Sequence, residues 1–217
     1  MPRLPARPYT SRTYAGGYDS YSILRPTTGI ETPKREKNGR QVLRSDEYTK
    51  MLSLAGANAR DYAILQVFLQ TGIRVSELAH LRIEDIDFIK PSITVRGKGK
   101  QEREIALEKK GIHALKSYLA VRPQNFSPRV FLNYQGEPIS ERGIRKLVVK
   151  YRKEAGITKK ASCHTLRHTF ATYKAEQGVS AFQLQQWLGH ANLNTTQIYV
   201  HLGKQNARKI MQETSLT

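Results

Sequence analysis

The sequence predicts an α+β domain that is mostly α-helical and contains one small antiparallel β-sheet. Several segments lack proline and repeat apolar residues at helical spacing, among them residues 61–70 and 165–177. Between them, residues 83–107 alternate apolar and polar side chains in three short segments, as half-buried strands do. The last two of these segments flank a Gly-Lys-Gly-Lys turn, which indicates a hairpin.

Residues that cap or interrupt helices predict the elements in the first half of the domain. Ser45 is expected to cap a first helix that ends near Gly56. Residues 61–70 are nearly all apolar, which predicts a buried helix that Gly72 ends. A helix is expected over 75–81, and the three strands over 83–88, 92–96 and 103–107.

The second half is expected to be helical. Helices are predicted over 109–121, 141–155, 165–177 and 181–188, followed by a short helix that carries Tyr199. Ser140 and Ser180 are in position to cap the second and fourth of these. The helix over 141–155 has an apolar stripe and a strongly basic side, which is either a solvated face or a DNA-binding face. Its candidate DNA contacts are Arg142, Arg145 and Lys146.

The composition points to a polyanionic partner. The formal net charge is +18 over 217 residues, and the basic residues are spread along the chain. A single cysteine excludes a disulfide framework and fits a reducing cytoplasm. The sequence has no apolar run long enough to span a membrane, and an acidic membrane surface is the weaker alternative partner.

Residues 1–40 differ from the rest, because prolines, one glycine pair, tyrosines and basic residues replace the apolar pattern. This composition predicts a largely disordered basic arm or linker. It is either an untethered tail or an arm that follows DNA phosphates.

The chemistry is concentrated in residues 161–202, which contain His164, Arg167, His190 and Tyr199. Arginine binds two phosphate oxygens in a fork, histidine shuttles protons near neutral pH, and tyrosine can attack phosphorus. A zinc site at His164 and His168 is disfavoured, since no Glu follows the first histidine as in the HExxH motif. His168 and Cys163 are interpreted as packing residues.

Two earlier residues are candidates for the same site. Arg74 lies between apolar helices, where an unpaired charge is costly. Either the Arg74 guanidinium pairs with Glu77 or another acidic residue, or it faces a ligand anion. Lys98 and Lys100, in the hairpin turn, compete for the role of a basic residue that reaches a ligand.

These motifs resemble the tyrosine recombinases of the phage-integrase family, which includes the Xer-type proteins. The resemblance is carried by TGIRVSEL at residues 71–78, GKGKQER at 97–103, HTLRH at 164–168, LGH at 188–190 and the tyrosine nine residues later. It implies a catalytic set of Arg74, Lys98, His164, Arg167, His190 and Tyr199. It also implies that Lys100 and Arg103 contact the DNA backbone.

The resemblance further implies the organisation and the activity of the protein. We expect a catalytic domain over 41–203 and a C-terminal segment, 204–217, for docking on a neighbouring subunit. The expected activity is site-specific recombination of double-stranded DNA by a tetramer assembled on DNA from monomers, without metal or cofactor. We expect a cytoplasmic, nucleoid-associated protein of prokaryotic, archaeal or phage origin. A type IB topoisomerase and a catalytically silent accessory protein are the alternatives. The chain leaves no room for the family's core-binding domain, so we expect a truncated or naturally short recombinase.

Overall fold

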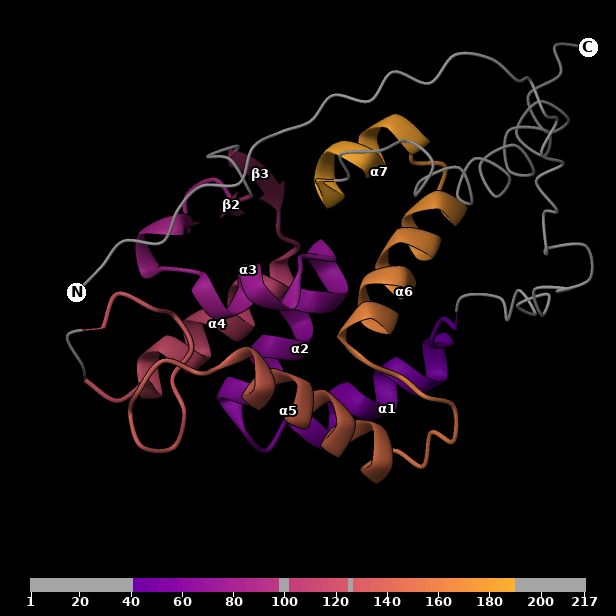
Figure 1. Ribbon diagram of the computed structural model, residues 1–217. Coiled ribbons are helices and arrows are strands. Elements are labelled where there is room, and N and C mark those ends of the chain that lie inside the picture. Colours follow the sequence, from indigo (N-terminus) through magenta and orange to yellow (C-terminus); the bar gives the residue numbers. More distant parts are fainter. Residues whose placement is uncertain (1–40, 98–101, 125–126, 190–217) are drawn as a thin grey trace, which may run out of the picture. The chain divides into compact units, whose positions relative to one another are not determined.

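The structure, a computed structural model, describes residues 41–97, 102–124 and 127–189 (Figure 1). It confirms the predicted fold class, a mostly helical domain with a three-stranded antiparallel sheet. The elements are α1 (Ser45–Ala55), α2 (Ala59–Thr71), α3 (Val75–His80), the 3₁₀ turn η1 (Ile83–Asp85), β1 (Ile86–Asp87), β2 (Ser92–Arg96), β3 (Glu102–Ala106), α4 (Lys109–Val121), α5 (Glu141–Glu154), α6 (Cys163–Glu176) and α7 (Ala181–Leu188).

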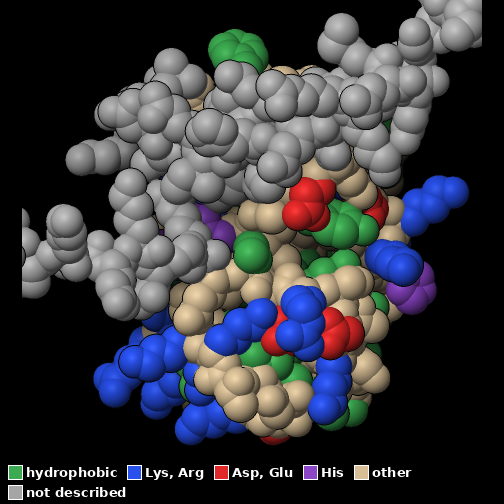
Figure 2. Space-filling model, turned by 90° about the vertical axis from the view of Figure 1, so that its right-hand side faces the viewer, with side chains coloured by type: hydrophobic (Ala, Val, Ile, Leu, Met, Phe, Trp, Pro, Cys, Tyr) green, Lys and Arg blue, Asp and Glu red, His purple; other side chains and the backbone are tan. Residues whose placement is uncertain are grey.

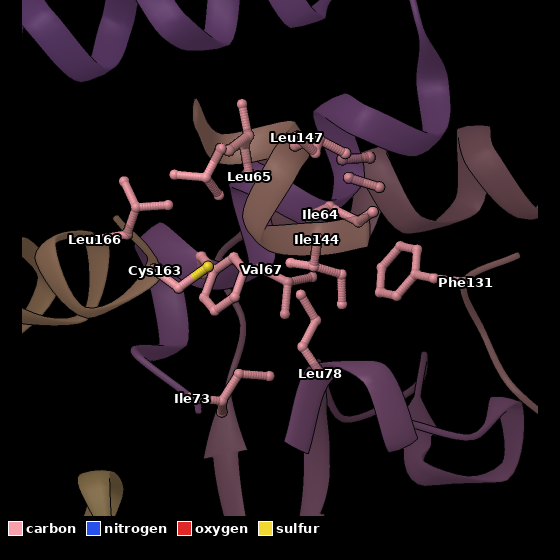
Figure 3. Packing of buried hydrophobic residues seen from close by; sticks show 14 of the residues in the cluster. Ile64, Leu65, Val67, Ile73, Leu78, Phe131, Ile144, Leu147, Cys163 and Leu166 are labelled. Atoms are coloured by element: carbon pink, nitrogen blue, oxygen red, sulfur yellow. The ribbon is translucent and has the colours of Figure 1, made fainter. Parts of the chain in front are cut away.

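Helix α2 is the centre of the domain, and α1, α4, α5 and α6 all pack against it. This follows from its sequence, because apolar residues occupy nearly every side of the helix and can be buried only by surrounding it. Figure 3 shows Ile64, Leu65 and Val67 of α2 among apolar side chains from α3, α5 and α6. The core therefore holds α3 and the first half of α6 at fixed positions around α2.

Local hydrogen bonds set most helix ends where the sequence predicts them. The side chains of Ser140 and Ser180 accept from backbone N–H groups at the third position of α5 and α7. Gly72 ends α2 in the left-handed conformation, with φ of 58°. The predicted cap of α1 is wrong by one residue, since Arg44 is the N-cap and its backbone N–H donates to the Glu47 carboxylate at 2.7 Å.

The sheet has the order β1-β2-β3, and its register pairs Ile93 with Ile105 and Val95 with Arg103. The prediction of a strand over 83–88 is wrong for its first half, which forms the 3₁₀ turn η1. The backbone N–H of Arg82 donates to the Asp85 carboxylate at 2.8 Å, and this bond closes the turn. A period-two pattern cannot distinguish a strand from such a capped turn.

Some predictions fall outside the described residues. These are the arm over 1–40, the helix that carries Tyr199 and the segment 204–217. Within the part that is described, no helix has the length and apolar character that crossing a membrane requires.

Candidate active site

Three arginines from different elements meet at the C-terminal end of α7. A helix leaves its last carbonyl groups without internal partners, and its C-terminal end attracts cations. Here each of three consecutive carbonyl oxygens accepts from a different guanidinium. The pairs are Arg103 Nε to Trp187 O, Arg167 Nη2 to Leu188 O and Arg74 Nη2 to Gly189 O, each at 2.7 Å. The end of α7 is thus fixed immediately before residue 190.

Arg167 joins the ends of two helices. Its side chain projects from the second turn of α6 and is buried, and its Nη1 donates to the Gly72 carbonyl at 2.7 Å. The two acceptors, Gly72 and Leu188, are the residue that ends α2 and the last residue of α7. A buried guanidinium requires such acceptors, because an unsatisfied buried charge is costly.

Arg74 is the N-cap of α3 and is held by Glu77, one turn later. The Glu77 carboxylate accepts from the Arg74 backbone N–H at 2.7 Å and from Nη1 at 3.0 Å. Of the two alternatives that the sequence left open, pairing with Glu77 is therefore present. The Arg74 side chain is nevertheless 40% exposed, so it is also open to an anion from outside.

Arg103 has different partners from those that the sequence predicted. Its guanidinium makes a two-point ion pair with Glu77, at 3.0 and 2.8 Å, in addition to its bond to Trp187. The side chain is only 15% exposed, so its main observed contacts are with protein rather than solvent. Three of its five guanidinium N–H groups thus donate to protein acceptors, and the contact with the DNA backbone stays a prediction.

A signal for this arrangement was present in the sequence. Arg103 and Ile105 lie two residues apart on one strand and so face the same side of the sheet, and Ile105 is buried. An arginine on the apolar face of a predicted strand indicates an internal partner. Sequence reasoning did not use this signal.

Glu77 is ionised despite its burial. Burial raises the pKa of its carboxyl group, but hydrogen bonds from Arg103 and from the Arg74 backbone, with the charge of Arg103, outweigh this effect. The net result is a pKa below the ordinary value for glutamate. The carboxylate is therefore a fixed negative charge between two arginines.

The other predicted residues of α6 are arranged as follows. His164 is exposed in the first turn, three residues before the buried Arg167. His168 is half-buried, and Cys163 is a buried packing residue, where burial raises the pKa of its thiol to about 11. In the described ranges, no group of three or more His, Cys, Asp or Glu side chains could hold a metal ion. Lys98, Lys100, His190 and Tyr199 lie outside the described residues.

A cleft of about 1180 Å³ adjoins the arginine cluster and is bounded by α3, the β2–β3 hairpin and α7. Arg74, Glu77 and Arg103 line it together with Arg96, Trp187 and Gly189. A second cleft, of about 860 Å³, is lined by residues of α1, α2, α4 and α6 and contains none of the predicted site residues. The first cleft is therefore the candidate active site.

The predicted DNA-binding side of α5 is exposed. Ile144, Leu147, Val148 and Tyr151 are buried as predicted, and this leaves Arg142, Arg145 and Lys146 exposed. Arg145 pairs with Glu141 one turn earlier, a surface contact that contributes little to stability. On the face drawn in Figure 2, Lys and Arg side chains gather in the lower half, at the level of α1 and α5.

Comparison with known proteins places the chain in a family. The profile of the phage integrase family matches residues 41–206. Tyrosine recombinase XerD of Staphylococcus saprophyticus is 38% identical over 204 residues, which are 90% of this chain and 69% of that protein. XerD of Staphylococcus aureus strain Mu50 is 36% identical over the same share of this chain.

Solved structures agree. The crystal structure of XerA recombinase matches 82% of this chain and 66% of that protein, with a TM-score of 0.71 and 34% identity. XerH bound to its difH substrate, in a post-cleavage complex, matches 82% of this chain and 53% of that protein, with a TM-score of 0.68 and 27% identity. The chain thus spans about two thirds or less of these solved proteins. The family match over most of the sequence, with the likeness in fold, shows that this chain belongs to the phage integrase family, the tyrosine recombinases.

Proposed function

We propose that this protein cleaves and rejoins double-stranded DNA at specific sites through a covalent 3′-phosphotyrosine intermediate. The observation that carries the proposal is the meeting of Arg74 and Arg167 around the end of α7, at adjacent carbonyl groups. These two arginines come from segments far apart in the sequence, and the turn that they hold leads directly to His190 and the segment of Tyr199.

Arg74 and Arg167 would bind the two non-bridging oxygens of the scissile phosphate. Guanidinium groups held in advance stabilise the additional negative charge of a pentavalent transition state without reorganisation at the moment of reaction. The partly exposed Arg74 is available to an incoming phosphate, and Arg167 is fixed by two carbonyl groups. His164 and His190 would complete this anion shell.

Cleavage exchanges one ester bond at phosphorus for another. The phenolic oxygen of Tyr199 forms a bond to phosphorus, and the bond from phosphorus to the 5′ oxygen breaks. His164 accepts the phenolic proton, and Lys98 gives a proton to the departing 5′ oxygen. The 5′ hydroxyl group of a partner strand then attacks phosphorus and gives its proton to Lys98. The bond from phosphorus to the phenolic oxygen breaks, His164 returns its proton to Tyr199, and a phosphodiester is restored.

We propose that neither a metal ion nor a nucleotide takes part. The ester to Tyr199 conserves the energy of the phosphodiester bond, so rejoining needs no further energy source. The arginines supply the charge stabilisation that a metal ion supplies in other phosphoryl-transfer enzymes. Chelation of divalent ions should therefore leave the rate of adduct formation unchanged, and a chelator-sensitive rate would contradict this part of the proposal.

Partner contacts are also proposed. DNA-bound relatives such as XerH and the Tn1549 transposon integrase support DNA as the ligand. Exposed Arg142, Arg145 and Lys146 on α5 would contact the duplex, and Lys100 would contact the backbone near the cleavage site. We propose that monomers assemble into a tetramer on paired recombination sites.

The decisive experiment traps the covalent intermediate. Nicked duplexes with randomised sequence are incubated with the protein, and protein–DNA adducts that resist denaturing detergent are isolated and sequenced. The wild type should form adducts at a preferred sequence, while Tyr199→Phe should bind DNA and form none. Normal adduct formation by Tyr199→Phe would refute the assigned nucleophile.

A relaxation assay separates recombination from topoisomerase activity. Supercoiled plasmid that lacks the selected sequence should remain supercoiled, because a site-specific recombinase acts at its site. Efficient relaxation of such a plasmid would favour a type IB topoisomerase. Sequence-specific binding without any adduct would favour a silent accessory protein.

A further inference from the structure

We infer that Arg103 is a positioning residue that offsets the charge of Glu77 and so leaves the Arg74 guanidinium cationic toward a bound phosphate. This inference deepens the proposed function, since it rests on Arg74 as a phosphate-binding group. Arg103 has no role in the proposed reaction. Its contacts with protein were not expected from the sequence.

Arg74 and Arg103 share the carboxylate of Glu77. Glu77 Oε1 accepts from Arg103 Nη1 and Arg74 Nη1, both at 3.0 Å. Glu77 Oε2 accepts from Arg103 Nη2 at 2.8 Å and from the Arg74 backbone N–H at 2.7 Å. Both oxygens thus serve both arginines, and neither ion pair can change without affecting the other.

The net charge around Arg74 depends on Arg103. Arg74 and Glu77 alone sum to zero, so a phosphate that approaches Arg74 would meet a neutral pair with a carboxylate 3.0 Å from the guanidinium. With Arg103 the group of three carries one net positive charge. Opposite charges at such distances interact strongly in a partly buried site, so the compensating charge changes the field at Arg74.

The three side chains are buried to different extents. The side chain of Glu77 is 6% exposed and that of Arg103 is 15% exposed, against 40% for Arg74. The compensating charge is therefore mostly enclosed, and the more exposed cation of the three is Arg74. This order fits a group in which Arg103 balances Glu77 internally and Arg74 faces the ligand.

Arg103 is held from two directions. Its backbone lies in β3, paired with Val95 of β2, and its Nε donates to the Trp187 carbonyl of α7. Its guanidinium also lies against Gly189, where an added Cβ would come within 3.0 Å of Nη1. Arg103 therefore fixes the place of the Glu77 carboxylate relative to both the hairpin and α7.

The test uses an anion that needs no knowledge of the DNA site. Trp187 is the one tryptophan of the sequence and lines the cleft, so its fluorescence can report titration with inorganic orthovanadate, which resembles phosphate. The variants are Arg103→Gln, Glu77→Gln, the double variant and Arg74→Gln. Arg60→Gln is the matched control, since Arg60 pairs with the buried Asp61 by its own ion pair at 2.7 Å.

The charge account predicts a specific pattern of rescue. Arg103→Gln should weaken vanadate binding on the order of 10-fold, an indirect effect smaller than the 10²–10³-fold loss typical of a direct transition-state donor. Glu77→Gln in the same chain should restore binding to within about threefold of the wild type, because it removes the charge that Arg103 offsets. Arg74→Gln should abolish binding, and Arg60→Gln should leave it unchanged.

Two results would overturn the inference. One is a wild-type affinity of Arg103→Gln for vanadate. The other is a double variant that binds vanadate as weakly as Arg103→Gln, which would mean that Arg103 acts only by holding α7 in place. If Arg103→Gln fails to fold, Arg103→Lys replaces it. Lysine retains the positive charge but cannot make the two-point hydrogen bond of a guanidinium group. A vanadate affinity within about threefold of the wild type would support the role of the Arg103 charge, and a loss like that of Arg74→Gln would refute it.

The same variants separate this inference from the proposed function. Each is also assayed for the covalent DNA adduct. A wild type that forms no adduct, together with the predicted vanadate pattern, would refute the recombination reaction and leave the role of Arg103 intact. Normal adduct formation with the opposite vanadate pattern would refute the role of Arg103 alone.

Discussion

The substitution Gly72→Ala tests how closely the ends of α2 and α7 must approach each other. Gly72 has φ of 58°, and a Cβ atom there would lie 2.4 Å from Cδ1 of Phe170 and 3.1 Å from Cδ2 of Leu188. Contacts this short cannot persist, and the aromatic ring is packed in a small core formed by α6 and α7. The substitution therefore combines backbone strain with overpacking.

The expected loss of stability has two parts. The left-handed conformation costs a residue with a Cβ about 1–2 kcal/mol, and overpacking of a close-packed core costs about 1–3 kcal/mol. Together they predict a decrease of about 2–5 kcal/mol in the free energy of unfolding. Gly178→Ala is the matched control, because Gly178 also has a positive φ, of 87°, but no atom lies within 4 Å of its added Cβ. It should show the first part alone.

Urea denaturation followed by Trp187 fluorescence and by circular dichroism measures both variants. Because the Gly72 carbonyl also accepts from Arg167, folded Gly72→Ala should bind orthovanadate more weakly, whereas Gly178→Ala should bind it normally. Equal stability of the two alanine variants would show that Phe170 and Leu188 yield without cost, and would refute the argument from close approach.

Other measurements test the site from different sides. Arg167→Ala should slow adduct formation on the order of 10²-fold per folded molecule, and a wild-type rate would exclude it as a transition-state donor. DNA affinity should fall steeply as salt rises, and a flat response would contradict a backbone-dominated interface. Glu77 has a lowered pKa, so its contribution to stability is present above the ordinary glutamate pKa and is lost as pH falls through the folded value. Glu77→Gln should therefore reduce the loss of unfolding free energy at acid pH. An unchanged pH dependence of stability would contradict this role of Glu77. Cys163, with a pKa raised to about 11, should react with iodoacetamide at pH 8 only after unfolding, and rapid labelling of the folded protein would contradict its burial.

Elements that depend on interactions between residues close in the sequence were predicted correctly more often than contacts between distant residues. Helices α4 and α5 and the strand β2 are specified by apolar periodicity, and α5 also by the Ser140 side chain that caps it. Sequence reasoning found all three. The first half of the strand predicted over 83–88 forms a turn instead, because the Asp85 side chain accepts from the Arg82 backbone N–H three residues earlier. A motif shared with a known family identified Arg74 and Arg167 as candidates, but not their contacts.

Apart from the local pair of Arg74 with Glu77, the described partners of Arg74, Arg103 and Arg167 were decided by tertiary structure. Arg74 and the Gly189 carbonyl are 115 residues apart in the sequence, and Arg103 and the Trp187 carbonyl are 84 apart. No local pattern specifies such pairs, because they depend on how α3, β3 and α7 pack around α2 and α6. The amino-acid order by itself determined which side chains were available for an anion site, and the packing of the core decided which of them face a ligand and which, like Arg103, face another charge.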